Sequence, residues 1–380
     1  MTREIVVNGR FLARRVTGVE RYGREILRYT GSNSRVEVTR RQGWTGHAWE
    51  QFILPAKLSQ HSMLWSPANT GPLLVRDQAL TIHDLSPLEH PEWFRAGFAA
   101  WYRLFLPILA KRVQKVFTPS EYVKQKVIER FGVRNVTVTP NGVDHAVFHP
   151  DAKQTRFDLP ASYILFVGTL EPRKNLDLLL CAWDAIRNDF KETWLVIVGV
   201  SGNVFRNIDY LHPMERVRFL GYVDDQTLAG LYANATLFVL PSQEEGFGLP
   251  ALEAMTSGTP VIVSDGGALP EVVGEAGMIF KIEPRRHAST ELSTGSDTEN
   301  KRSSPVDKKL RDSVSPWLAA PRSSCDPASI TPQHELISAL RECLSNPRLR
   351  SSLKEKGLAR AGKFSWQATA ELVWKSLNEI

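Results

Sequence analysis

The sequence has few cysteines and no long apolar run. Cys181, Cys325 and Cys343 show neither the spacing of a metal site nor the even number of a disulfide framework, which favours a reduced, cytoplasmic setting. No stretch offers the roughly 20 apolar residues that a membrane span needs, and the first residues lack the apolar core of a secretory signal. These absences argue against a disulfide-rich secreted domain and against a membrane-spanning helix.

The chain of 380 residues is basic only in parts. Its formal net charge is +6 and its pI is about 9.2, which admits nucleic acid, an anionic membrane or a phosphorylated substrate as a partner. Counted by region, the charge is +9 for residues 1–150, −8 for 151–284 and +5 for 285–380. The basicity therefore belongs to the two ends of the chain, and the middle is acidic.

Short apolar runs alternate with helical patterns, which predicts parallel sheets covered by helices. We expect an α/β fold of two doubly wound, Rossmann-like domains facing a cleft, with ligands at the carboxyl ends of the strands. The domains are expected at residues 1–155 and 156–360, with a disordered insertion at 285–325 and a final helix in 361–380 that packs back on the first domain. The expected strands are 5–7, 79–82, 115–118, 136–139, 163–167, 194–198, 218–220, 237–240, 261–263 and 277–280.

The densest signal for chemistry is the segment 241–253, directly after an expected strand. Two glycines let its backbone approach a ligand closely, and a strand, a Gly-bearing turn and a helix N-terminus together form an anion site. Glu245 precedes the helix and Glu253 lies about one turn inside it. Carboxylates do not bind phosphate, so hydrogen bonding to sugar hydroxyls is their expected use. The alternative is one helix-capping and one solvated carboxylate.

A second signal, at 167–175, also follows a strand and precedes a helix. Its adjacent Arg173 and Lys174 can clamp a diphosphate and stabilise the charge that develops as it leaves. The alternative is a solvated pair beside Asn175 as a helix cap. Because the chain has no Gly-x4-Gly-Lys-Ser/Thr and no Gly-x-Gly-x-x-Gly turn, P-loop hydrolysis and ordinary dinucleotide binding are disfavoured.

Two weaker signals lie in the first half. Gly18 opens the first expected helix and can bring backbone donors to a phosphate, although a turn glycine without function is the simpler interpretation. His83 ends an apolar run that points into the expected cleft, where a histidine is more often structural. Gly18 and His83 become candidate site residues only when they are considered together with the other polar residues.

Together these segments resemble the retaining glycosyltransferases of the GT-B fold, group 1 or family 4. The strongest marker is Glu-x7-Glu, with Glu245 and Glu253 inside Glu-Gly-Phe-Gly-Leu-Pro-Ala-Leu-Glu. Supporting segments are Gly168-Thr169 with Arg173-Lys174-Asn175, Pro140-Asn141-Gly142-Val143-Asp144, Thr118-Pro119-Ser120 and Gly18-Val19-Glu20-Arg21-Tyr22. The resemblance covers most of the chain apart from 285–325.

The resemblance implies a role for each candidate. Glu253 would bind the donor ribose, Glu245 would face the donor sugar, and Arg173 and Lys174 would hold the diphosphate. The backbone at Gly168, Gly248 and Leu249 would complete the phosphate site, with Gly18 opposite, His83 near the reacting centre and the nucleotide base near 219–223. Since no Asp-x-Asp stands in a metal-binding context, we expect no metal and no other cofactor.

The resemblance further implies an enzyme, a hexosyltransferase, of bacterial polysaccharide assembly. Segments such as Gly-Val-Glu-Arg-Tyr and His-Asp-Leu-Ser-Pro look most like mannosyltransferases of exopolysaccharide or lipopolysaccharide, which favours GDP-mannose as donor and a lipid-linked glycan as acceptor. UDP-glucose and UDP-N-acetylglucosamine stay open as donors. Two functions of a different class also stay open: nucleotide-sugar binding without turnover, and nucleic-acid binding, against which the acidic middle region argues.

The basic first half also carries an aromatic stretch at 93–109 with cations such as Arg103, Lys111 and Arg112 close by. Such a stretch can lie in a membrane interface, with its cations meeting anionic headgroups. We therefore expect a cytoplasmic protein that docks peripherally on the inner face of the cytoplasmic membrane and accepts a polyprenyl-diphosphate-linked saccharide. The alternative is a pair of helices packed on the core and interrupted at Pro107.

Overall fold

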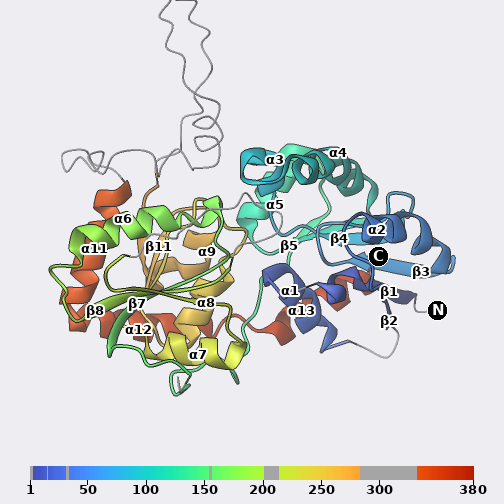
Figure 1. Ribbon diagram of the computed structural model, residues 1–380. Coiled ribbons are helices and arrows are strands. Elements are labelled where there is room, and N and C mark those ends of the chain that lie inside the picture. The colour runs from blue at the N-terminus through green and yellow to red at the C-terminus, as the bar shows by residue number, and fades with distance from the viewer. Residues whose placement is uncertain (1–2, 15, 31–33, 154–155, 201–213, 283–331) are drawn as a thin grey trace, which may run out of the picture.

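The computed structural model describes residues 3–14, 16–30, 34–153, 156–200, 214–282 and 332–380. The expected insertion at 285–325 lies outside the described residues. Two lobes are visible, each with a central sheet flanked by helices (Figure 1). Each sheet has six strands, all of them parallel. The expected α/β, doubly wound fold is confirmed.

The first sheet has the order β2-β1-β3-β4-β5-β6, so its strand order reverses between β1 and β3. Its strands are β1 (Glu4–Asn8), β2 (Ser34–Glu37), β3 (Ser62–Ser66), β4 (Gln78–Thr81), β5 (Lys115–Thr118) and β6 (Val136–Val138). Its helices are α1 (Gly18–Leu27), α2 (Gly43–Ala48), α3 (Ser86–Glu89), α4 (Ala96–Arg112) and α5 (Glu121–Phe131), with a π-helical turn at Trp49–Ile53 after α2.

The second sheet has the order β12-β11-β10-β7-β8-β9, which reverses between β7 and β10. Its strands are β7 (Ser162–Val167), β8 (Thr193–Val198), β9 (Val217–Gly221), β10 (Leu237–Leu240), β11 (Val261–Ser264) and β12 (Met278–Phe280). Its helices are α6 (Leu176–Ile186), α7 (Asp225–Asn234), α8 (Leu249–Thr256), α9 (Leu269–Val273), α11 (Pro332–Ser345) and α12 (Pro347–Ala361).

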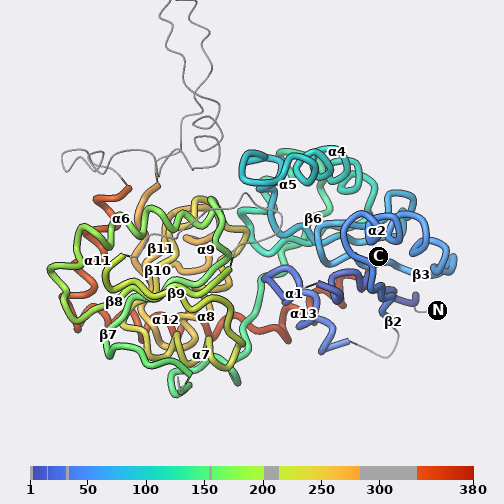
Figure 2. Tube along the Cα trace, in the orientation of Figure 1, coloured from blue at the N-terminus to red at the C-terminus, as the bar shows by residue number. Residues whose placement is uncertain are grey.

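The last helix, α13 (Trp366–Asn378), lies against α1 of the first lobe, and both views show it there (Figures 1 and 2). Its Trp374 meets Trp65 of β3 edge-on at 5.6 Å. Where the chain crosses back, a Cβ on Gly142 would lie 2.1 Å from the backbone nitrogen of Trp366. The glycine of the Pro-Asn-Gly segment is thus needed for this close backbone crossing.

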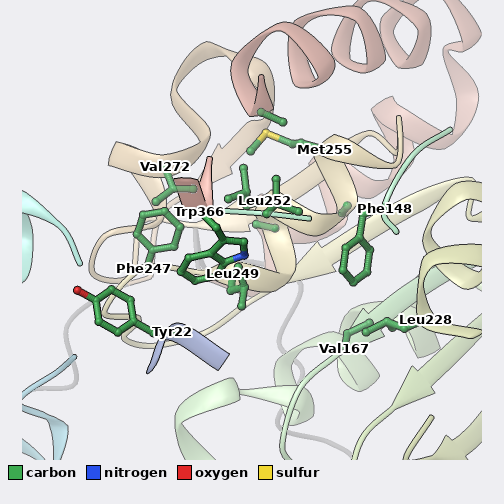
Figure 3. Close-up of a cluster of buried hydrophobic side chains, with 14 of the residues drawn as sticks. Tyr22, Phe148, Val167, Leu228, Phe247, Leu249, Leu252, Met255, Val272 and Trp366 are labelled. Carbon is green, nitrogen blue, oxygen red and sulfur yellow. The ribbon is translucent and has the colours of Figure 1, made fainter. Parts of the chain in front are cut away.

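One apolar cluster runs through both lobes. It contains Tyr22 of α1, Trp366 of α13, and Phe247 and Leu249 of the second lobe, and it extends to Phe148 (Figure 3). Because these side chains are almost completely buried, the hydrophobic effect stabilises the lobes in contact with one another. The two lobes therefore share this cluster at the level of α1 and α8.

Two local expectations differ from the structure. Strands β2 and β3 are absent from the expected strands, because Ser-Arg-Val-Glu is short and mostly polar and Ser-Met-Leu-Trp-Ser lacks β-branched residues. The stretch near Pro107 forms one continuous helix, α4, and is not interrupted there. The proline leaves the carbonyl of Arg103 without its helical donor, and Arg103 is on the exposed side, where water can replace that donor.

Candidate active site

The strand order of the second sheet defines where its ligand site lies. Counted along the chain from β7, the order is 3-2-1-4-5-6, and in such sheets ligands bind beyond the carboxyl ends of the strands where the order reverses. That position lies between β7 and β10. The segments that follow these two strands are 168–175 and 241–248, which carry most of the residues named from sequence.

Glu245 is the centre of the polar contacts at this edge. Its Oε1 accepts hydrogen bonds from Lys174 Nζ at 2.6 Å and from Ser242 Oγ at 2.7 Å. Its Oε2 accepts from Arg173 Nη1 at 3.1 Å. Arg173 also donates to Oε1 of Glu171. The structure thus brings Arg173, Lys174 and Glu245 into direct contact, and Ser242 joins them although no sequence pattern marks it.

The cations decide the ionisation of Glu245. Burial alone would raise the pKa of Glu245, but Lys174 and Arg173 outweigh it and hold that pKa at about 2. Burial lowers the pKa of Arg173, and the nearby Glu171 and Glu245 more than reverse this. Glu245 is consequently ionised at neutral pH, and an anionic ligand would meet Arg173 and Lys174 already oriented by this carboxylate.

The backbone beside this cluster is shaped for close approach. Gly248 has φ +97° and precedes α8, so the first N–H groups of that helix face the same edge. A Cβ on Gly248 would lie 2.5 Å from Leu269, and Leu249 follows as the first residue of α8. Gly168, after β7, packs against the side chain of Lys174.

Glu253 lies deeper in α8 and has different partners. Its Oε2 accepts from the hydroxyl of Tyr232 at 3.2 Å, and Arg21 Nε of the first lobe lies 4.0 Å from its Oε1. Burial raises the pKa of Glu253 to about 7, with Arg21 lowering it and Asp225 raising it. The carboxyl is therefore divided between its neutral and ionised forms near pH 7.

The first lobe approaches this edge through His83, the second residue after β4. His83 is buried, its Nε2–H donates to the carbonyl of Pro67 at 2.7 Å, and burial lowers its pKa, so its ring is neutral. A Cβ on Gly246 would lie 2.0 Å from the carbonyl oxygen of His83. Gly18 is exposed at the start of α1, one turn before Arg21. The segment 219–223 spans the end of β9, at the same edge of the sheet.

Sequence reasoning missed a role for Glu244, whose side chain is buried against the first lobe. Its Oε1 accepts from Lys126 Nζ at 2.7 Å and from the Tyr122 hydroxyl at 3.3 Å, and His90 Nε2 lies 3.4 Å from its Oε2. The two adjacent glutamates thus have different partners. The Glu244 carboxylate contacts the first lobe, and the Glu245 carboxylate contacts the cations of the second lobe. In the sequence, only its position next to Glu245 marks Glu244 as a candidate.

The chain matches two consecutive family models. Residues 60–147 match the one described as Glycosyltransferase Family 4, and residues 148–293 match the one described as Glycosyl transferases group 1. The matched residues make up more than half of the chain. Together with the two doubly wound domains and the Glu-x7-Glu segment where the strand order of the second sheet reverses, they define the class as GT-B glycosyltransferases. The chain belongs to group 1, family 4 of these enzymes.

Two bacterial mannosyltransferases are similar to the chain over part of their length. The chain is 30% identical over 255 residues to O-antigen chain mannosyltransferase B of Escherichia coli, covering 63% of this chain and 64% of that protein. It is 31% identical over 228 residues to O-antigen chain mannosyltransferase RfbU of Salmonella typhimurium, covering 57% and 60%. The chain thus spans less than two thirds of the length of these relatives.

A solved structure with the same fold is HepE from Anabaena, in complex with UDP and glucose. It superposes with a TM-score of 0.66 at 16% identity, over 100% of both chains. At this identity the similarity establishes the arrangement of the two domains.

Proposed function

We propose that this chain is a retaining hexosyltransferase that moves mannose from GDP-mannose to a growing, lipid-linked saccharide in bacterial exopolysaccharide or lipopolysaccharide biosynthesis. The observation that carries the proposal is the direct contact of Lys174 and Arg173 with Glu245 where the strand order reverses, with Glu253 about one turn inside the helix that follows. The similarity to two O-antigen mannosyltransferases supports the choice of sugar and pathway.

The residues support specific roles. Arg173, Lys174 and the N-terminus of α8 would bind the diphosphate, and Glu253 would accept hydrogen bonds from the ribose hydroxyls. The cations are held by Glu245 before the donor arrives, so little reorganisation is needed when charge develops on the leaving group. A metal ion would then be unnecessary, since two fixed cations supply the same electrostatic stabilisation.

Retention would follow from attack on the same face of the sugar. The bond from the anomeric carbon to the diphosphate oxygen breaks, the acceptor hydroxyl oxygen bonds to that carbon, and the hydroxyl proton passes to the departing diphosphate. Glu245 would face the donor sugar, and Gly18 would contact the phosphates from the first lobe. His83, kept neutral by burial although its hydrogen bond to the Pro67 carbonyl acts in the opposite direction, would contact the donor sugar through a hydrogen bond without adding charge.

Membrane docking is part of the proposal, and one face of the first lobe supports it. Trp44, Phe52, Leu104 and Ile108, from α2, the following π-turn and α4, are exposed by 67%, 75%, 61% and 44%. The cations Arg103, Lys111 and Arg112 on α4 are also exposed. Aromatic, aliphatic and cationic side chains on one face suit the interface of an anionic bilayer. No helix in the described part of the chain is both long and apolar enough to cross a bilayer.

Sedimentation with vesicles tests the docking. We expect the protein to pellet with vesicles that contain phosphatidylglycerol, to pellet less with pure phosphatidylcholine, and to be released by salt. Replacement of Trp44 and Phe52 by Ser should weaken the association without changing turnover on a soluble acceptor. Association that is insensitive to both lipid charge and salt would contradict the proposal.

The decisive experiment for the activity uses membranes and a panel of labelled donors. The purified protein is incubated with bacterial membranes and GDP-mannose, UDP-glucose or UDP-N-acetylglucosamine, and label is measured in the lipid extract. We expect label only from GDP-mannose, with an unchanged anomeric configuration in the product. Label from a UDP-sugar would favour that sugar as the donor. Binding of a donor without transfer from any of them would favour a nucleotide-sugar-binding protein.

A further inference from the structure

We propose that Arg21 is a positioning residue that crosses from the first lobe to Glu253 and couples contact between the lobes to donor binding. The inference rests on the proposed function, because it takes Glu253 as the carboxylate that binds the donor ribose. Arg21 itself need not touch the donor. It acts through the carboxylate that does.

The contacts of Arg21 join elements that are far apart in the chain. Arg21 Nη1 and Nη2 donate to the two carboxylate oxygens of Asp225 at 2.8 and 2.6 Å, a bidentate pair between α1 and the start of α7. The third nitrogen, Nε, lies 4.0 Å from Oε1 of Glu253 on α8. Asp225 thus orients the guanidinium so that its remaining N–H side faces Glu253.

The position of Arg21 is fixed by the residue after it. Tyr22 is completely buried, its ring lies edge-on to His83 and Trp366, and its hydroxyl forms a hydrogen bond with Thr139 at 2.8 Å. Figure 3 shows this ring beside the apolar cluster that α8 shares. Arg21 can therefore reach Glu253 only while α1 and α8 are in contact.

The charge of Arg21 matters because Glu253 is buried and, among the described residues of its own domain, no cation acts on it. The charged and titratable groups that act on it are Arg21 of α1 and Asp225 and Tyr232 of α7. Burial raises the pKa of Glu253 to about 7, Arg21 lowers it, Asp225 raises it, and the Tyr232 hydroxyl lowers it by donating a hydrogen bond. On its other side, α8 packs on α12 through uncharged Met255 and Gly357.

The consequence is a thermodynamic coupling. An ionised carboxylate accepts hydrogen bonds from two ribose hydroxyls more strongly than a neutral acid does. Contact between the lobes brings Arg21 to Glu253 and favours the ionised form, so it strengthens donor binding. By reciprocity, a bound donor favours contact between the lobes by the same factor.

The test measures GDP binding by calorimetry from pH 6 to 9 in wild type, Arg21→Gln, Glu253→Gln and the double variant. We expect Arg21→Gln to weaken GDP binding at pH 7 about tenfold, a typical coupling between sites, and to move the pH dependence of binding to higher pH. In the Glu253→Gln background the same change should have little effect, because the carboxylate on which Arg21 acts is gone. Binding to the Glu253→Gln variant also shows how much of the pH dependence comes from ionisation of GDP itself.

Two further variants distinguish the effect of the charge of Arg21 from the effect of its geometry and from a general effect of substitution in α1. Arg21→Lys keeps a cation and should restore part of the pH profile, whereas Arg28→Gln, on the exposed side at the end of α1, should bind GDP like wild type. Equal GDP affinities and pH profiles for wild type and Arg21→Gln would overturn the inference and leave the proposed function intact. Wild type that binds neither GDP nor UDP would instead overturn the proposed function.

Discussion

The two carboxylates of the Glu-x7-Glu segment form two contrasting clusters. Glu245 and Glu253 are equally buried, at 5% and 4% exposure, yet burial and partners set their pKa values to about 2 and about 7. Glu245 is bound by two cations and a hydroxyl of its own domain, whereas Glu253 has one hydroxyl and a more distant cation from the other domain. Burial does not determine the charge of a carboxyl group; the nearest partners do.

The difference also divides the proposed site in function. The Glu245 cluster is complete within the second domain, so the diphosphate half of the site exists whether or not the lobes meet. The Glu253 cluster is complete only when α1 of the first domain is in place. We infer that the donor meets a preformed phosphate site first and a ribose site that depends on the first domain second.

The largest expected effect comes from breaking the Glu245 cluster. Lys174→Ala removes the cation at 2.6 Å and leaves Glu245 with Arg173 and the Ser242 hydroxyl. Loss of one preorganised electrostatic contact costs about 100- to 1000-fold in turnover. We expect that loss in kcat with GDP-mannose, measured by product release.

The matched control for this change is Lys191→Ala, whose side chain is exposed. It should keep the kcat of the wild type. A Lys174→Ala enzyme within a fewfold of wild type would remove Lys174 from the proposed mechanism, and with it the assignment of the phosphate site.

The second prediction compares how Glu245 and Glu253 contribute to the stability of the protein at different pH. Glu245 has a lowered pKa, so its contribution to stability is present above pH 4.5 and lost as the pH falls toward 2. Glu253 has a raised pKa, so its contribution is present below pH 4.5 and lost as the pH rises through about 7. Each contribution corresponds to about 3 kcal/mol.

Melting temperatures of wild type, Glu245→Gln and Glu253→Gln across this pH range check the signs. The Glu245→Gln variant should melt well below wild type at pH 8, and the difference should shrink in acid. The melting temperature of the Glu253→Gln variant should rise relative to that of wild type as the pH increases from 5 to 8. Parallel pH profiles for the two variants would show that the clusters do not differ in charge.

The third prediction concerns the glycine that lies between the clusters. A Cβ in Gly246→Ala would lie 2.0 Å from the carbonyl oxygen of His83, so the lobes would have to move apart locally. Overpacking of this kind costs about 1–3 kcal/mol. We expect a lower melting temperature and weaker GDP binding, because Arg21 would lose its position at Glu253.

Gly97→Ala is the control for Gly246→Ala, since a Cβ at Gly97 meets nothing within 4 Å. It should melt at or above the temperature of wild type, because alanine favours the helix in which it lies. If Gly246→Ala weakened GDP binding no more than Gly97→Ala does, contact between the lobes would not govern the Glu253 cluster.

The sequence predicts one cluster better than the other. The strand 237–240, the turn after it and the helix with Glu253 follow from local signals: a β-branched and aromatic run, two glycines and a proline near the helix start. The resemblance to the family assigns roles to Arg173, Lys174 and Glu245, and the reversal of the strand order explains why they meet. Those roles remain predictions.

The contacts across the lobes could not be predicted in the same way. Arg21 and Asp225 are 204 residues apart, and Lys126 and Glu244 are 118 apart, so no local pattern links them. Strand β3 lacks the usual β-branched residues, and α4 continues through a proline because the affected carbonyl is exposed. In each case tertiary contacts or solvent override the local preference.

The smallest expected effect tests the hydrogen bond from the Tyr232 hydroxyl to the Glu253 carboxylate. Tyr232→Phe removes a hydroxyl that donates to Oε2 at 3.2 Å, and burial raises the pKa of that hydroxyl well above its ordinary value, so it is always a donor. Loss of one such bond is worth about 1 kcal/mol, which is about fivefold in affinity. GDP should bind about fivefold more weakly at pH 7, and less of the difference should remain at pH 9, where Glu253 is ionised in both proteins. Tyr163→Phe removes a hydroxyl of similar burial that donates to the Leu231 carbonyl instead, and it should leave the pH profile unchanged. If both variants shifted that profile alike, the ionisation of Glu253 would depend on packing between β7, α7 and α8 rather than on its own partners, and the contrast with Glu245 would lose its basis.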